Sequence, residues 1–199
     1  TLTPKDVEKE YDSNTYSAGI ASATDENGKT VTIEYSADGK NWTTDPSTIT
    51  ATDVADSNEA IQVRASVPGT YTGYVTGTQK LVITAKAVTI TANSHDDITY
   101  DGKTHTVEGY SVATVVSGET VSGISASRTE TEVNTYATTV IDRDKIKVTK
   151  ADGKTDSTGN YTFSYVDGSF KIVEASIVDY VTLTPKDVEK EYDSNTYSA

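Results

Sequence analysis

The first eighteen residues of the chain return unchanged at its end. Residues 1–18 and 182–199 both read TLTPKDVEKEYDSNTYSA, an offset of 181 residues (182 − 1). Identity over that length does not arise by chance, so we expect a segment of a tandem array that is slightly longer than one period. Repeats at a fixed period build modules along one axis. This pattern favours an extended scaffold and disfavours a self-contained enzyme.

The composition favours thin β layers near solvent over one large core. Hydrophobic residues make up 35% of the 199 residues, which is low for a single core of this size. Tyr occurs 13 times, against two Phe and one Trp. A Tyr side chain can bury its ring while its hydroxyl stays in water. The chain has no Cys, which excludes disulfides and thiolate metal sites.

The net charge of −13 argues against two classes of partner. Nucleic acids and anionic membranes would both repel such a chain. The 199 residues also contain no apolar run of about 18 residues, no signal peptide and no sorting motif. We therefore expect no nucleic acid, no membrane insertion, and acidic modules that repel one another and stay extended.

A second, weaker repeat lies within the period. The segments that match are Val88–Thr91 with Val181–Thr184, Glu10–Tyr16 with Thr99–His105, and Tyr74–Gly77 with Tyr165–Gly168. This similarity predicts two related modules, at residues 1–86 and 87–180. Residues 181–199 would then be the opening strand of the next repeat. The junction Thr84–Val88 contains neither Gly nor Pro, which predicts a stiff link and modules that lie end to end.

Residues of both modules alternate between apolar and polar with the period of a β-strand. Val31–Tyr35 alternates in this way, Asp38-Gly39 predicts a hairpin turn, and Asn41–Thr43 predicts the return strand. Other predicted strands are Ile61–Ser66, Lys80–Thr84, Val88–Thr91, Lys145–Thr149, Tyr161–Tyr165 and Phe170–Val173, and other predicted turns are Asn27-Gly28, Asp101-Gly102, Asp152-Gly153 and Asp167-Gly168. A short helical turn is expected from near Pro46 through Ile49–Val54. The predicted fold is all-β: two tandem related small modules, each sandwich-like or β-grasp-like, in an elongated arrangement.

Several of these segments resemble a known kind of module. The segments are Tyr100–Thr104, Val107–Tyr110, Thr131–Tyr136 and Gly159–Ile172, with Glu34–Trp42 and Gly69–Tyr71 in the first module. They are similar to the YDG and MBG repeat modules of large bacterial cell-surface proteins. The resemblance implies a repeat unit of a Gram-positive adhesin, outside the cell at the surface or wall. The first module departs from the pattern with Asp12-Ser13 in place of Asp-Gly, and with Asn58–Ala60 in place of a Gly-Thr-Tyr-like corner.

Candidate sites are few, and each has a simpler alternative. His95 and His105 with Asp96 and Asp97 could hold a metal, but a predicted turn lies there and no third ligand group follows. Asp25–Gly28 and Asp142–Asp144 carry calcium-type oxygens without the full spacing of a calcium loop. We therefore expect no metal, no cofactor and no catalytic residue.

Two further possibilities concern ligands and covalent bonds. Trp42 follows a hairpin turn where its ring could stack on a sugar, or could pack across its own hairpin, and Tyr35 is the second candidate ligand contact. Adhesin modules can carry Lys–Asn or Thr–Gln crosslinks, which the resemblance alone suggests here. Asn160 is the candidate amide, but the opening strand Val88–Thr91 supplies no Lys, and Gln62 and Gln79 are the only glutamines.

The sequence thus favours a structural or adhesive repeat that holds a distal binding region away from the cell. The alternative is that the repeat itself binds a host glycan, mucin or extracellular protein, weakly in one copy and strongly through many. Neighbouring repeats are expected partners in both cases. We expect residues 182–199 to pack on residues 87–180, or on a neighbouring chain by strand exchange, because the strands that would complete their module are missing.

Overall fold

The computed structural model describes residues 1–196, which form an all-β protein. The helical segments among these residues are five 3₁₀ turns of three residues each, η1 (Pro46–Thr48), η2 (Val54–Asp56), η3 (Arg143–Lys145), η4 (Thr158–Asn160) and η5 (Ile177–Asp179). The all-β prediction is confirmed. The helical turn expected from Pro46 is two short turns, η1 and η2, with a short strand between them.

Residues 1–84 contain eight strands. They are β1 (Leu2–Thr3), β2 (Val7–Glu10), β3 (Tyr16–Ser17), β4 (Ser22–Ala23), β5 (Thr32–Ser36), β6 (Thr50–Ala51), β7 (Asn58–Ser66) and β8 (Val75–Thr84). The main sheet has the order β2-β8-β7-β5, in which β2 runs parallel to β8 and the other pairs are antiparallel. Two small antiparallel pairs, β1-β4 and β3-β6, complete this half.

Residues 86–173 contain eleven strands in several small sheets. They are β9 (Lys86–Ala92), β10 (His95–Thr99), β11 (His105–Glu108), β12 (Tyr110–Val112), β13 (Thr120–Ser122), β14 (Ser125–Glu130), β15 (Asn134–Thr138), β16 (Val140–Ile141), β17 (Lys147–Thr149), β18 (Tyr161–Val166) and β19 (Gly168–Val173). The strand orders are β12-β9-β18, β10-β19-β15, β11-β14-β16 and β13-β17. Strand β9 runs parallel to β18, and β10 runs parallel to β19.

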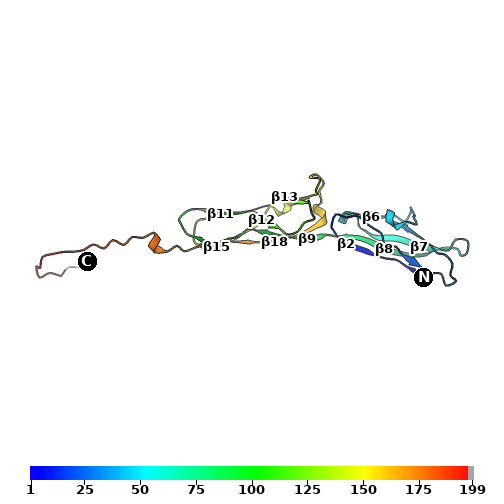
Figure 1. The fold of residues 1–199 in the computed structure, drawn as a ribbon, viewed down its shortest axis with the longest axis horizontal. Helices are drawn as coiled ribbons and strands as arrows, with labels where there is room; N and C mark the ends of the chain where they lie inside the picture. Colours follow the sequence, from blue (N-terminus) through cyan, green and yellow to red (C-terminus); the bar gives the residue numbers. More distant parts are fainter. Residues whose placement is uncertain (197–199) are drawn as a thin grey trace.

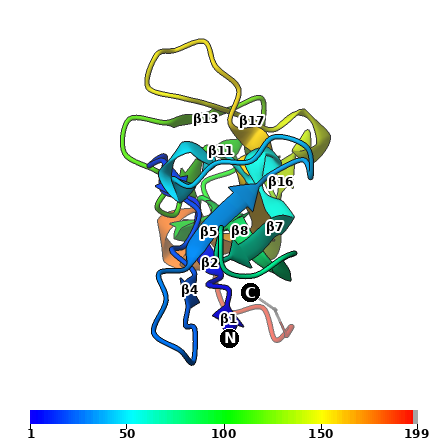
Figure 2. The same cartoon turned by 90° about the vertical axis from the view of Figure 1, so that its right-hand side faces the viewer.

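The two groups of strands occupy different parts of the long axis. Within residues 1–196, strands of residues 1–84 pair only with one another, and so do strands of residues 86–173. Figure 1 shows β2, β6, β7 and β8 toward one end, β9, β12 and β18 in the middle, and the residues after β19 at the other end. Figure 2 looks along this axis and shows β5, β7 and β8 crossing in front, with β1, β4 and the N-terminus to one side.

The core joins the two groups of strands. One cluster of buried side chains includes Tyr11, Leu81 and Ile83 on one side, and Val88 and Tyr161 on the other. Burying a large apolar side chain contributes about 1.5–3 kcal/mol. Because β8 ends at Thr84 and β9 begins at Lys86, the chain passes from one group to the other through a single residue.

Most predicted strands form, and two local predictions are wrong. The predicted return strand Asn41–Thr43 is only a single bridge between Tyr35 and Thr43. The predicted turn at Asp167-Gly168 is absent, and Gly168 instead begins β19. A Cβ on Gly168 would lie 2.3 Å from the carbonyl oxygen of Asn93, so glycine here permits a close approach of two chain segments where the strand changes sheets. Lys145, the first residue of the segment predicted at Lys145–Thr149, is the last residue of η3, and the strand forms only over β17.

The residues after β19 lie away from the strands. Figure 1 shows this segment, coloured orange to red, running outward along the long axis. Residues 182–196 form no strand, and the side chains of Leu183, Val188 and Tyr192 are exposed. These large side chains do not pack on residues 87–180, which contradicts that part of the expectation. Strand exchange with a neighbouring chain stays a prediction, and residues 197–199 lie outside the described residues.

Candidate functional site

Tyr35 is a core residue in the structure. Its side chain is 2% exposed, and its hydroxyl accepts a hydrogen bond from the Ala21 amide at 2.9 Å. The alternation of β5 places Tyr35 inward, against Val63 of β7. Tyr35 nevertheless lines a shallow open hollow together with Trp42, so its role as a ligand contact stays a prediction.

Trp42 stacks on a cation of its own sheet. The Arg64 guanidinium lies 3.9 Å from the centre of the Trp42 ring and 4.3 Å from that of Tyr74. The Arg64 Nε donates to Glu34 Oε2 at 2.8 Å across the β5-β7 pair. Cation–π contacts of this kind stabilise by roughly 0.5–2 kcal/mol. One face of Trp42 is thus occupied by Arg64 of β7, a strand outside the predicted hairpin, so the expected packing across the hairpin is not what holds this ring.

The site that the sequence did not reveal lies where the two groups of strands meet. Glu119 is a carboxylate with only 8% of its surface exposed. Three hydroxyl groups donate to it at 2.7 Å each: Tyr11 Oη to Oε1, and Ser157 Oγ and Tyr161 Oη to Oε2. Tyr11 belongs to residues 1–84, and the other three groups belong to residues 86–173. The carboxylate therefore ties the two halves together through buried, charge-assisted hydrogen bonds.

The two tyrosines of this site also contact each other. The rings of Tyr11 and Tyr161 meet edge to face, with centroids 5.4 Å apart and planes at 80°. Burial raises the pKa of Tyr11, and the hydrogen bond to Glu119 adds to this. Burial likewise raises the pKa of Tyr161. Both phenols therefore stay protonated at neutral pH and act as donors to the Glu119 carboxylate.

A second polar cluster crosses the same boundary. Lys150 Nζ lies 2.7 Å from Asp53 Oδ1, and Asn160 Nδ2 donates to the same oxygen at 2.8 Å. The Val54 amide donates to Asn160 Oδ1 at 2.8 Å. These bonds join η2 of the N-terminal half to η4 of the C-terminal half. We call Glu119, Tyr11, Tyr161, Ser157 and this second cluster together the junction network.

The second cluster contains the groups that a Lys–Asn crosslink would need, since Asp53 contacts both Lys150 and Asn160. Bond formation requires a neutral amine that attacks the amide carbon. The hydrogen bond to Asp53 raises the pKa of Lys150, which keeps its ammonium protonated. The contacts thus describe an ion pair with an amide neighbour. Of the two glutamines weighed for a Thr–Gln bond, Gln79 is buried and bonds the Lys5 amide and the Gly19 carbonyl.

Several of the candidate metal ligands bond to other groups of the chain. His105 Nε2 lies 2.9 Å from Asp101 Oδ1, and Asp96 Oδ1 accepts from Ser169 Oγ at 2.6 Å. Asp25 Oδ2 accepts from the amides of Asn27 and Lys29. Within residues 1–196, no three His, Asp or Glu side chains converge as a metal site would require. No helix of the described chain has the length and apolar character to cross a bilayer.

Comparisons with protein-family models, with curated proteins and with solved structures find no match to this chain.

Proposed function

We propose that the chain is a stalk repeat of an extended bacterial surface protein, made of two related β modules that follow one another in a line. The observation that carries this proposal is the junction network, which is buried around Glu119 and partly exposed around Asp53. A stalk must resist bending where one module meets the next. A link of one residue between β8 and β9, held by Glu119 and by Asp53, limits bending there. The exact 181-residue repeat supplies the array in which such a unit works.

Equivalent hydrogen bonds in the two halves support their relation as modules. The Tyr11 amide donates to the Thr84 carbonyl and the Tyr100 amide to the Val173 carbonyl, both at 2.9 Å. Each tyrosine follows a strand that runs parallel to the last strand of its half. Shared opening and closing contacts of this kind support an internal duplication.

The turn after each of these tyrosines also matches. Asp12 accepts from Tyr16 Oη at 2.6 Å, and Asp101 pairs with His105 Nε2 at 2.9 Å, each across four residues. The residue after each aspartate has a positive φ, 69° at Ser13 and 74° at Gly102. Ser13 therefore adopts the conformation of the glycine that the YDG-like pattern has at this place. This supports the proposed relation of the first module to the second.

Scattering from chains of one and two periods tests the proposal. We expect the maximum dimension of a two-period chain to be close to twice that of one period, because each period adds to the same axis. The net charge of −13 per 199 residues favours separation of neighbouring modules. A two-period chain whose maximum dimension hardly exceeds that of one period would contradict the stalk.

A second function has one observation in its favour, the aromatic pair of Trp42 and Tyr74. Tyr74 is exposed and shares the Arg64 cation with Trp42. Exposed aromatic rings around a charged group can recognise a sugar or a host protein. We propose this as the alternative, in which the repeat binds a host glycan, mucin or extracellular protein. A screen of glycans and mucins with the chain and its Trp42→Ala variant tests it, and no binding by the unaltered chain would exclude it.

A further inference from the structure

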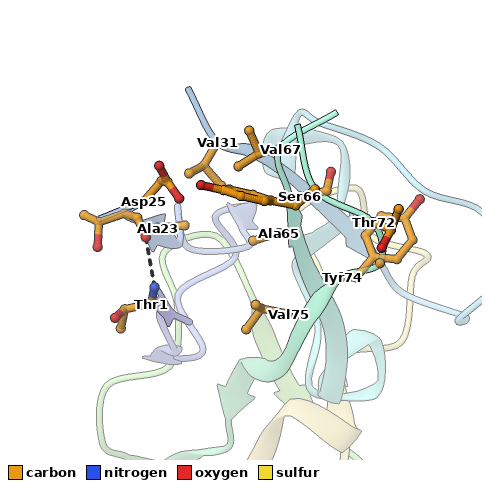
Figure 3. Close-up of a pocket in the computed structure, with 13 residues that line it drawn as sticks. Thr1, Ala23, Asp25, Val31, Ala65, Ser66, Val67, Thr72, Tyr74 and Val75 are labelled. Atoms are coloured by element: carbon orange, nitrogen blue, oxygen red, sulfur yellow. Dashed lines mark hydrogen bonds between the residues drawn. The ribbon is translucent and has the colours of Figure 1, made fainter. Parts of the chain in front are cut away.

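An open cavity of about 300 Å³ lies beside the first residue of the chain. Its lining is mostly apolar and aromatic, and includes Val31, Val67, Tyr71, Tyr74 and Val75. Figure 3 shows Thr1 and Asp25 on one side, Tyr74 on the other, and Val31 with Val67 above. A partly apolar hollow at the start of a strand is a place where more of that strand could fit.

The β1-β4 ladder ends at the edge of this cavity. The Thr1 ammonium donates to the Thr24 carbonyl and the Thr24 amide donates to the Thr1 carbonyl, both at 2.9 Å, which continues the register of Leu2 with Ala23. A residue before Thr1 would therefore lie opposite Asp25, which also lines the cavity. Because side chains alternate along a strand, that residue would point inward, on the same face as Leu2 and Ala23.

The repeat identifies the residue that would stand there. Thr182 is the counterpart of Thr1, so in an array Val181 precedes the first residue of the next period. The segment Ile177–Val181 has exposed apolar side chains, and Val181 is 59% exposed. Within this segment, Tyr180 Oη donates to the Tyr100 carbonyl at 3.0 Å, which holds the connecting segment on its own period.

The second half of the chain already shows the completed arrangement. There Val88 stands before Thr89 as Val181 stands before Thr182, and the Ala113 amide donates to the Thr89 carbonyl as Thr24 does to Thr1. Val88 lies next to Phe163 of β18 and is only 2% exposed. A valine at this position of the opening strand is therefore buried when the strand continues upstream.

We propose that the cavity beside Thr1 is the docking site for Val181 of the preceding period. The valine would extend β1 along β4 and fill the space between Asp25 and Val75, while Tyr180 stays bonded to its own period. This proposal deepens the proposed stalk function and rests on it. In this proposal the connection between one period and the next forms by extension of strand β1 with residues of the preceding period.

The test adds the five residues Ile177–Val181 before Thr1, so that residues 1–199 themselves are unaltered. We expect the melting temperature to rise by about 4 °C or more, since burial of a valine in a domain of roughly 100 residues has an effect of this size. We also expect amide exchange to slow about tenfold over residues 22–26 and 73–76, because the added strand protects these segments from opening. The control is the same extension with the Val181→Asp substitution in the added segment.

Each outcome decides the proposal independently of the stalk. Docking is supported if the valine extension raises the melting temperature and slows amide exchange, while the aspartate extension leaves both as in the unextended chain. Equal melting temperatures and equal amide exchange in the valine and aspartate extensions overturn docking, even if a two-period chain scatters as a rod. Protection by the valine extension in chains that pack side by side would support docking and contradict the stalk. If a glycan slows amide exchange over residues 71–75 equally well with and without the valine extension, the cavity is not filled by the valine and docking is overturned.

Discussion

The two connections of the period differ in how they are held. Between β8 and β9 a single residue, Ala85, links the halves, and the junction network buries Glu119 and Tyr11 between them. After β19 the connecting segment is longer, and its side chains Ile177, Val178 and Val181 are exposed. The side chains of the first connection are buried within one period. The apolar side chains of the second connection are not buried by the period to which they belong. Under the proposals made above, a period of this kind is stiff inside and is completed by its neighbour.

Removal of the Glu119 carboxylate is the largest expected disruption of the first connection. Glu119→Ala leaves three buried hydroxyls without their acceptor, and we expect the free energy of unfolding to fall by roughly 3 kcal/mol. Urea unfolding measures this, with Glu189→Ala in the exposed segment as the control. A loss below about 1 kcal/mol would show that water replaces the carboxylate and that the network does not hold the halves together.

The exact repeat supplies a matched pair for the next comparison. Tyr11 and Tyr192 occupy the same position of the repeat, but Tyr11 is fully buried on Glu119 and Tyr192 is 92% exposed. We expect Tyr11→Phe to cost about 1–2 kcal/mol through the lost bond to a charged acceptor. Tyr192→Phe should change stability by less than about 0.5 kcal/mol. If Tyr11→Phe and Tyr192→Phe change the thermal stability equally, the account of a buried first connection and an exposed second one is contradicted.

The ion pair of Asp53 and Lys150 should contribute less, because both side chains are partly exposed. We expect Asp53→Asn to cost about 1 kcal/mol at neutral pH after allowance for screening by solvent. The pKa of Lys150 is raised in the folded state, so its contribution is complete below the ordinary lysine pKa and is lost as pH rises through the folded value. The stability difference between the two proteins should therefore narrow above about pH 10.4. If the stability difference between the unaltered protein and Asp53→Asn stays constant from pH 8 to pH 11, the lost stability comes from the bond of Asp53 to Asn160 and not from the ion pair with Lys150.

The smallest effect is expected at the far end of the second connection. Deletion of residues 182–199 removes side chains such as Leu183 and Val188, which are exposed. We expect an unchanged melting temperature, measured by calorimetry, and light scattering tests the strand exchange separately. Conversion of a dimer to a monomer on deletion would instead support strand exchange between chains.

Local patterns predicted the strands, but not the contacts between them. Alternation placed Ile61–Ser66 in β7 and Val88–Thr91 in β9, because the period of two is visible within a few residues. The parallel pairing of β9 with β18 joins segments about 75 residues apart (161 − 86), and no local pattern encodes it. The Asp167-Gly168 dipeptide misled because glycine is common in turns, whereas here it permits a close approach of two chain segments.

The junction network was missed for the same reason. Glu119 and Tyr11 are 108 residues apart, and Asp53 and Lys150 are 97 apart. The one local signal was the abundance of Tyr, since a buried phenol needs an acceptor and a buried Glu needs donors. The resemblance to YDG and MBG modules, and with it the adhesin function, stays a hypothesis.

The relative orientation of the two halves in solution tests the stiff first connection most directly. Residual dipolar couplings of backbone amides, collected for the whole chain in a dilute aligned medium, report this orientation. The junction network requires one alignment tensor to fit residues 1–84 and 86–173 together, and Glu119→Ala should split it into two of different magnitude. Two independent tensors in the unaltered chain would contradict the stiff connection.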